Sequence, residues 1–325
     1  MPSLLERIFC KDHRLRPLLR ALLYPLAVAA FAGFLSSVYF LSGGAIAGGR
    51  RSLPAGYAGA VLGEFLLAAA ALTVALVMRR WLDRRSLESL GLPARGPWSR
   101  LFLIGVAFGA AMQILVYLMH RMLGYSQVVA YAAPGRDVEV VGAALVVFLV
   151  AALFEEISLR GYLLQNLWEE WGFAPAAVVT SSLFAVLHFS NPHAHEKAAL
   201  TAGGLVLFSL WAAFSLLWTK SLWLVLGCHA AWNTFEGPIF GFPLSGLAMP
   251  VPSAVTQRIS GPEWFTGGAF GPESGVSSML ALTLGFAVLA AFYRAGIFSD
   301  AADTRESYAK ASELFFPSRS ALVRS

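Results

Sequence analysis

The sequence predicts an all-α membrane protein, a polytopic bundle of about eight transmembrane helices that encloses a polar intramembrane cavity. The chain has 325 residues, of which 57% are hydrophobic and 13% charged, with a mean hydropathy of +0.65. A soluble domain of this size carries more surface charge. Apolar windows of spanning length recur along the chain, and acidic and imidazole side chains interrupt some of them. These observations together favour a membrane bundle with a polar interior.

The apolar windows are expected to be helices because lipid leaves only helices or closed barrels able to satisfy every backbone group. Continuous apolar runs such as 143–154 lack the alternation of barrel strands. No internal repeat is visible, which removes support from an inverted-repeat transporter. The expected windows are about 21–43, 57–79, 101–120, 140–167, 174–191, 199–218, 221–240 and 277–294.

Lysine and arginine are concentrated in three segments that an even number of spans places on one side. These are the N-terminal segment, the loop at 79–100 and the C-terminal end from 294 onward. The positive-inside rule then predicts that both termini are cytoplasmic, in a cell membrane such as a bacterial inner membrane. The net charge of +5 follows from these flanks. No aromatic residues interleave with them, so the expected contact is the lipid bilayer and no nucleic acid.

Four regions follow from this pattern. Residues 1–20 form a basic cytoplasmic segment, 21–137 the N-terminal transmembrane helices, 138–295 the functional core and 296–325 a polar tail. Within the core, residues 236–275 contain eight glycines and six prolines. Such a long loop is expected to be a functional lid or disordered. Its aromatic residues are expected to pack on the membrane surface.

Two adjacent acids, Glu155 and Glu156, lie deep in an apolar window, one turn before Arg160. A carboxylate at bilayer depth costs roughly 2.5–3.5 kcal/mol on the insertion scale, so intramembrane acids are functional by default. Spacing of four residues places Glu156 and Arg160 on one helix face, where they should pair. Glu155 points about 100° away without a partner on its own helix, as expected of a general base. The alternative is that Glu155 faces a water cavity or binds a neighbouring helix.

Two further windows carry His188 and the pair His229 and Asn233. The four-residue spacing places the imidazole of His229 and the amide of Asn233 on the same face. Taken singly, each is as well explained by packing or a bridge between helices. If the three helices pack together, however, the groups converge on one pocket. A glutamate base, two imidazoles and an amide donor suit the activation of water against a carbonyl group.

Other polar residues carry weaker signals. His193, His195 and Glu196 follow an Asn-Pro pair and are expected in an exposed loop, with a surface metal site as the minor alternative. Glu64 lies in the second window. It either lines the cavity, or extends its carboxylate to the membrane surface, or pairs with a group on a neighbouring helix. Glu169 and Glu170 are expected to be interfacial charges.

Three motifs in chain order resemble the CPBP family, the CAAX-protease and bacteriocin-processing intramembrane proteases that include the type II CAAX prenyl endopeptidase. The motifs are Glu155-Glu156-x-x-x-Arg160, Phe184-x-x-x-His188 and His229-x-x-x-Asn233. The resemblance covers about residues 139–240 and implies proteolysis inside the membrane. It implies Glu155 as the water-activating base, His188 as the residue that holds the water or a metal, His229 and Asn233 as the oxyanion site, and Glu156 with Arg160 as positioning groups.

The cofactor and the function class have alternatives. Glu155, His188 and His229 meet the ligand count of a catalytic zinc site, although the chain lacks a His-Glu-x-x-His motif. The leading hypothesis is an endopeptidase that acts on a membrane-associated protein or peptide. The alternatives are a non-catalytic membrane interaction or immunity protein and a proton-coupled transporter.

Overall fold

The computed structural model describes residues 9–11, 14–41, 55–132, 136–247 and 253–298. The expected polar tail from residue 299 onward and the first loop at 42–54 lie outside the described residues. The elements are β1 Cys10–Lys11, β2 Arg14–Leu15, α2 Pro17–Leu41, α4 Ala55–Val77, η1 Met78–Leu82, η2 Leu87–Leu90, α5 Trp98–Met122, β3 Ser126–Tyr131, α6 Arg136–Glu156, η3 Ile157–Leu164, α7 Gln165–Trp171, α8 Phe173–His188, α9 Ala198–Thr219, α10 Trp223–Thr234, η4 Phe235–Ile239, β4 Val255–Ile259, α11 Glu263–Thr266, η5 Pro272–Ser274 and α12 Val276–Arg294.

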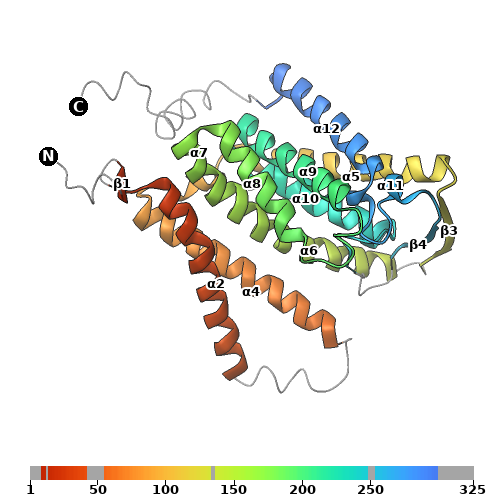
Figure 1. Cartoon of the computed structure of the whole chain (residues 1–325), viewed down its shortest axis with the longest axis horizontal. Helices are drawn as coiled ribbons and strands as arrows, with labels where there is room; N and C mark the ends of the chain where they lie inside the picture. The colour runs from red at the N-terminus through yellow and green to blue at the C-terminus, as the bar shows by residue number, and fades with distance from the viewer. Residues whose placement is uncertain (1–8, 12–13, 42–54, 133–135, 248–252, 299–325) are drawn as a thin grey trace.

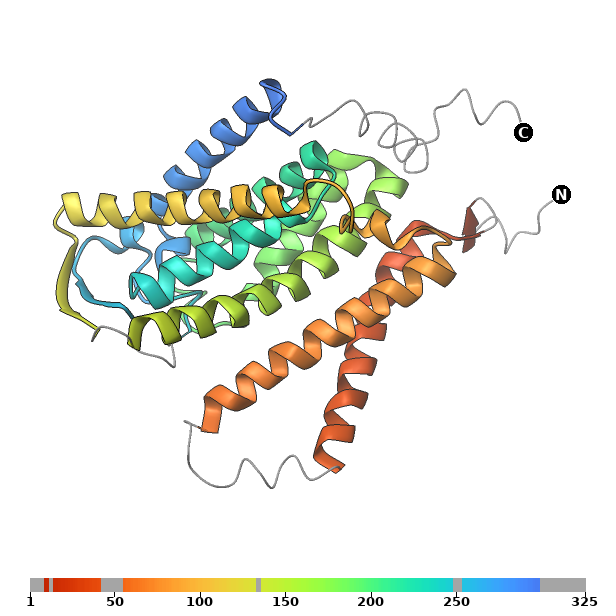
Figure 2. The same cartoon turned by 180° about the vertical axis from the view of Figure 1, so that it is seen from behind.

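The fold is an all-α bundle, as the sequence predicts. Helices α5, α6, α8, α9 and α10 run side by side, and α10 packs against α5, α6 and α9 (Figures 1 and 2). Ten of the twelve residues of α10 are buried, because apolar and small residues surround this helix on every face. The short helix α10 is therefore the centre of the bundle, and any polar group that it carries lies in the interior.

A hairpin of α2 and α4 extends away from this bundle (Figure 2). Helix α2 packs against α4 and α7, whereas α4 packs against α6 and η3. Only one wall of the hairpin is thus covered by protein, and apolar side chains such as Leu22, Leu26 and Phe34 remain exposed on α2. Exposed large apolar side chains on a long apolar helix are typical of a surface that faces lipid.

Five of the eight expected windows meet the length and composition of a membrane span among the described residues: Pro17–Tyr39, Leu62–Leu82, Trp98–Met122, Ala198–Thr219 and Val276–Arg294. The windows at 140–167, 174–191 and 221–240 are helical as well, but α8 has 16 residues and α10 has 12. The apolar character of α10 reflects burial inside the bundle, whereas α8 keeps Val178, Val186 and Leu187 exposed. Periodicity alone does not separate these two cases.

Helices α5 and α10 approach each other closely because glycines face the contact. A Cβ atom added to Gly105 would overlap the carbonyl of Leu224, and one added to Gly109 would overlap the carbonyl of Cys228. From the other side, Gly227 meets the carbonyl of Phe102 in the same way. Small residues allow helix backbones to pack this tightly in membranes. This contact fixes α10 against the longest helix of the bundle.

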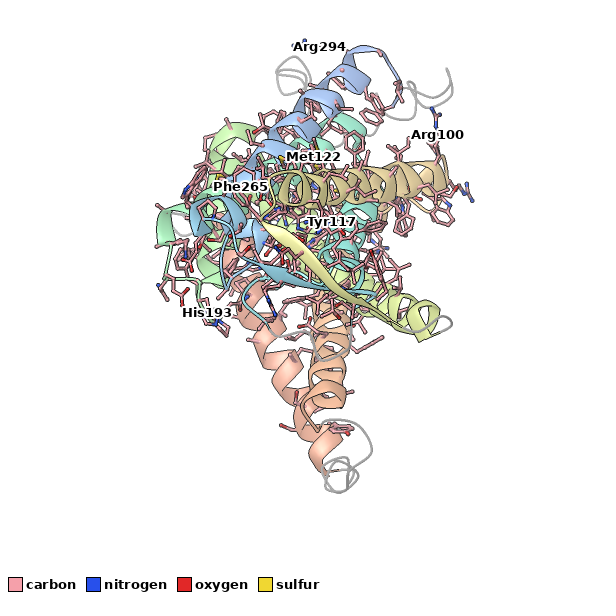
Figure 3. The ribbon with its side chains drawn as sticks, turned by 90° about the vertical axis from the view of Figure 1, so that its right-hand side faces the viewer. Arg100, Tyr117, Met122, His193, Phe265 and Arg294 are labelled. Carbon is pink, nitrogen blue, oxygen red and sulfur yellow. The ribbon has the colours of Figure 1, made fainter. Side chains whose placement is uncertain are left out.

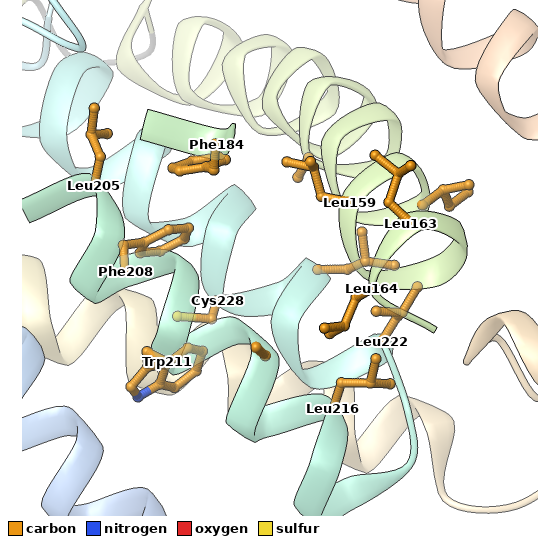
Figure 4. Packing of buried hydrophobic residues seen from close by; sticks show 14 of the residues in the cluster. Leu159, Leu163, Leu164, Phe184, Leu205, Phe208, Trp211, Leu216, Leu222 and Cys228 are labelled. Carbon is orange, nitrogen blue, oxygen red and sulfur yellow. The ribbon is translucent and has the colours of Figure 1, made fainter. Parts of the chain in front are cut away.

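The hydrophobic core lies between η3, α8, α9 and α10 (Figure 4). One buried cluster contains leucines of η3, aromatic residues of α8 and α9, and Cys228 of α10. Phe184 is 3% exposed and Trp211 is fully buried. The core therefore joins the three helices that carry the sequence motifs.

The described parts of the glycine- and proline-rich segment, residues 236–247 and 253–275, lie at one end of the bundle (Figure 3). Strands β3 and β4 pair antiparallel there, a small sheet that the all-helical reading did not include. The expectation that its aromatic residues pack on the membrane surface is wrong for most of them. Phe242, Phe265 and Phe270 are buried, and the Phe240 ring stacks on Tyr117 at 4.4 Å. The rings pack inward because the open end of the bundle offers apolar surface to bury.

The basic residues near the N-terminus are not simply lipid-facing anchors. Arg20 and Arg79 are buried: Arg20 Nη1 forms an ion pair with Asp83 Oδ1 at 3.0 Å, and Arg79 Nη1 donates to Asp83 Oδ2 at 3.0 Å. Arg85 pairs with Glu169 at 2.8 Å, and burial lowers the pKa of the Arg85 guanidinium to about 10, with Glu169 opposing the shift. Glu169 and Glu170, expected to be interfacial charges, thus bind arginines. Buried guanidinium groups require such acidic partners.

We expect Gly109→Ala to destabilise the protein, because the new methyl group forces α5 and α10 apart. Overpacking a tight contact typically costs about 1–3 kcal/mol. The measurement is the thermal midpoint of the detergent-solubilised protein, followed by size-exclusion chromatography. Gly63→Ala is the matched control: this α4 glycine has no atom within 4 Å of an added Cβ. Equal midpoints for the two variants would contradict the close approach.

Candidate active site

A cavity of about 310 Å³ opens between α4, α6, α8, α9 and α10. Most of its lining is apolar, for example Phe148, Leu205 and Leu282. The polar side chains in the lining are Glu64, Glu155, His188, Asn191, His229, Asn233, Ser245 and Glu273. The predicted convergence of Glu155, His188, His229 and Asn233 on one cavity is therefore confirmed in its geometry.

A buried trio of charged and polar side chains lies directly behind the cavity. Glu156 and Arg160 are completely buried, and Arg160 Nη1 donates to Glu156 Oε1 at 3.0 Å. The contact predicted from their four-residue spacing is confirmed. His229 Nδ1 also lies 2.8 Å from the same Glu156 oxygen. Sequence reasoning did not find this second contact, because it joins residues that are 73 positions apart.

Glu155 faces the cavity rather than the trio. A step of one residue turns the side chain by about 100° around the helix, and the Glu155 side chain keeps 25% exposure while Glu156 has none. Its Oε2 lies 3.8 Å from His229 Nε2, too far for a hydrogen bond. Its neighbour among the described residues is this imidazole from α10. His229 thus stands between the two adjacent carboxylates.

Aromatic rings hold the two imidazoles in place. His188 Nδ1 lies 2.8 Å from the carbonyl oxygen of Phe184, which leaves Nε2 as the ring nitrogen available to the cavity. The Phe184 ring lies 4.4 Å from the His188 ring, and the Arg160 guanidinium lies 5.0 Å from its centroid. Phe208 meets His229 edge-on at 4.9 Å. The spacing of Phe184 and His188 therefore has a physical role, since one ring supports both an imidazole and a cation.

Asn233 lies one turn after His229 and lines the same cavity. Just beyond it, Glu236 is fully buried and its Oε2 accepts a hydrogen bond from Gln113 Nε2 of α5 at 2.5 Å. Sequence reasoning placed Glu236 at the start of a loop and assigned no role to Gln113. A polar residue three positions after Asn233, on the same helix face, was the available signal.

Helix irregularities follow two of the motifs. The chain changes from α-helix to π-helix at Ile157, directly after the two glutamates, and again at Phe235, shortly after Asn233. The second π-helix contains Pro238, which cannot donate a backbone hydrogen bond. π-Helical turns inside helices frequently occur at functional sites.

The geometry does not assemble a metal site. In the part of the chain that the structure describes, no group of three His, Cys, Asp or Glu side chains is placed to hold a metal ion. Glu155, His188 and His229, the candidate zinc ligands, share the cavity but do not form such a group. The expected exposed loop is present at His193 and Glu196, whose side chains pair at 2.7 Å and are 45% and 52% exposed. Among the described residues, no third ligand lies beside this pair, so the minor alternative of a surface metal site receives no support.

Comparison with known protein families gives a match over the segment that carries the three motifs. Residues 137–235 match the family model of the Rce1-like type II CAAX prenyl endopeptidases. No curated protein and no solved structure matches the chain. The matched segment contains Glu155, Glu156, Arg160, His188, His229 and Asn233. Over residues 137–235 the chain is thus similar to the Rce1-like type II CAAX prenyl endopeptidases, and its apolar helices are those of a multi-pass membrane protein.

Proposed function

We propose that the protein is an intramembrane endopeptidase that hydrolyses a peptide bond of a membrane-associated protein or peptide. The observation that carries the proposal is the position of His229, which contacts Glu156 through one ring nitrogen and approaches Glu155 through the other. A carboxylate that is free to act as a base, beside an imidazole held by a second carboxylate, is the arrangement required to activate water.

In the proposed reaction, a water molecule binds between Glu155 and His188 Nε2. Glu155 takes a proton from the water as the oxygen attacks the substrate carbonyl carbon, which gives a tetrahedral intermediate with a negative oxygen. Asn233 and His229 donate hydrogen bonds to that oxygen. Collapse breaks the carbon–nitrogen bond, and Glu155 returns the proton to the departing amine. Every proton is thus accounted for by this chain's own residues.

His229 can serve as an oxyanion donor because its orientation is fixed from behind. Nδ1–H donates to Glu156, whose charge is in turn balanced by Arg160. With a proton also on Nε2, the ring donates toward the cavity at the same time. The trio behind the cavity therefore positions the donor, and its full burial keeps water from competing with these contacts.

We assign the water activation to Glu155 and His188 without a metal, because the described residues provide no three-ligand set. The active site opens within the membrane, so the substrate is expected to reach it from the bilayer. We further propose that both termini are cytoplasmic in a bacterial inner membrane, on the basis of the basic flanks.

Glu155→Gln is expected to reduce cleavage by at least roughly 10²–10⁴-fold, the usual contribution of general acid–base catalysis. The amide keeps the shape of the side chain, so the amount of folded protein should stay near wild type. Comparative proteomics of cells with either form identifies the membrane protein whose processing stops, and purified protein then gives the rate. His188→Ala should be comparably damaging and Asn233→Ala less so, since it supplies one of two donors. Wild-type processing by purified Glu155→Gln would refute the assignment and favour a non-catalytic role.

Arg160→Ala should lower the amount of folded protein, because it leaves Glu156 buried without its cation. Breaking a buried pair in this way typically costs about 3–5 kcal/mol. The check is the abundance and the thermal midpoint of the purified variant. Arg80→Ala is the matched control, since Arg80 is an exposed arginine in another helical segment. If Arg160→Ala is as stable as the control, the guanidinium does not offset the Glu156 charge.

Prolonged dialysis against a membrane-permeant chelator should leave activity unchanged, provided that the residual zinc content is shown to be negligible. If activity is lost on dialysis and zinc restores it, the water is activated by a metal that Glu155, His188 and His229 hold. Elemental analysis of the purified protein before and after dialysis provides the readout besides activity.

A further inference from the structure

The polar lining of the cavity falls into two groups. Four residues carry the proposed chemistry, and Glu64, Asn191, Ser245 and Glu273 remain without a role in it. We propose that Glu273, together with Glu64, is the specificity determinant that accepts a positively charged substrate group, the side chain of a lysine or arginine. This inference rests on the proposed function in one respect, that the cavity is where the substrate binds.

Glu273 is held in a defined position at the cavity wall. Ser245 Oγ donates to Glu273 Oε2 at 2.5 Å, and Asn191 Nδ2 donates to the carbonyl oxygen of Ser245 at 3.0 Å. These residues come from three segments: the turn after α8, the loop after η4, and η5. A carboxylate has about four acceptor sites, and the serine uses one of them. Glu273 is thus positioned and still able to accept hydrogen bonds from a cation.

The charge of the lining is unbalanced. Glu64, Glu155 and Glu273 line the cavity, and no lysine or arginine does so in the part of the chain that we describe. His229, doubly protonated in the proposed reaction, offsets only one of these three carboxylates. Within the same residues, neither Glu64 nor Glu273 has an ion-pair partner, whereas Arg160 is committed to Glu156 behind the wall. Carboxylates among apolar side chains are costly without a compensating charge. A cationic group on the substrate would supply it.

Glu155 gives an independent indication that a polar ligand lies in this space. Its side chain lines the cavity, and its Oε2 is buried without a hydrogen-bond partner among the described residues. Buried polar atoms are normally hydrogen-bonded, so a hydrogen-bond donor is expected in the cavity. Water or the substrate would supply that donor at Glu155, and a basic side chain of the substrate would supply one at Glu273.

The rest of the lining limits the class of substrate. The volume of about 310 Å³ lies at the lower end of ligand pockets, which span roughly 300–1,000 Å³. Apolar walls suit the aliphatic stem of lysine or arginine, which buries its methylenes while its charged head finds an acceptor. An acidic group, including a peptide C-terminal carboxylate, would be repelled by the three glutamates.

Binding tests this inference without cleavage. The probes are dansyl-Leu-Lys-Leu-amide and its norleucine and glutamate counterparts, titrated by fluorescence anisotropy against full-length Glu155→Gln in detergent. We expect the lysine probe to bind roughly tenfold to a hundredfold more tightly than the norleucine probe, as for a hydrogen bond to a charged group. Adding Glu273→Gln should abolish most of that preference and Glu64→Gln part of it. Adding Glu88→Gln, which removes an exposed carboxylate of η2, should leave it intact.

Equal affinity for the lysine and norleucine probes would overturn the inference, as would a lysine preference that survives loss of both Glu64 and Glu273. A cleavage experiment distinguishes failure of this inference from failure of the proposed function. Wild-type protein is incubated with fluorescence-quenched peptides that have random flanks and a fixed lysine, norleucine or glutamate. Cleavage without a preference for lysine refutes the inference and leaves the protease assignment standing. Lysine-selective binding without any cleavage supports the inference and counts against the protease assignment.

Discussion

The cost of burying Glu156 governs the architecture around the cavity. This carboxylate lies in an apolar bundle with no solvent exposure, and Arg160 and His229 contact the same oxygen. A buried charge without partners costs several kcal/mol, whereas a paired and hydrogen-bonded one is tolerated. Arg160 comes from the same helical segment, but His229 comes from α10. Glu156 therefore has both of these partners only when α10 occupies the centre of the bundle.

The close packing of α10 makes that position possible. Glycines at the α5 contact allow the two backbones to approach, and the aromatic residues of α8 and α9 fill the opposite side. Phe184 and Phe208 touch the imidazoles directly, so the hydrophobic core and the polar site share side chains. A core of this kind has little freedom to adjust. We infer that packing, rather than a bound ligand, sets the orientation of His188 and His229.

A second buried charge cluster ties the N-terminal region to the same framework. Asp83 accepts contacts from Arg20, Arg79 and the hydroxyl of Tyr162, the last belonging to η3. Tyr24 of α2 reaches Ser158, two residues after Glu156. The hairpin of α2 and α4 is thus connected to the segment that carries the glutamates. Glu64 of the same hairpin also lines the cavity, so the N-terminal helices contribute to the site as well as to membrane anchoring.

The sequence by itself determined the membrane character, the helical fold and the candidate residues Glu155, His188, His229 and Asn233, because each depends on composition or on spacing within one helix. The pairing of Glu156 with Arg160 is such a local property. Contacts between helices were decided only by the tertiary structure. These include the bond from His229 to Glu156, the partnership of Gln113 and Glu236, and the entry of Glu64 and Glu273 into the cavity. Windows such as 221–240 were read as spans because burial in protein and burial in lipid select the same apolar residues, and only the packing of neighbouring helices distinguishes them.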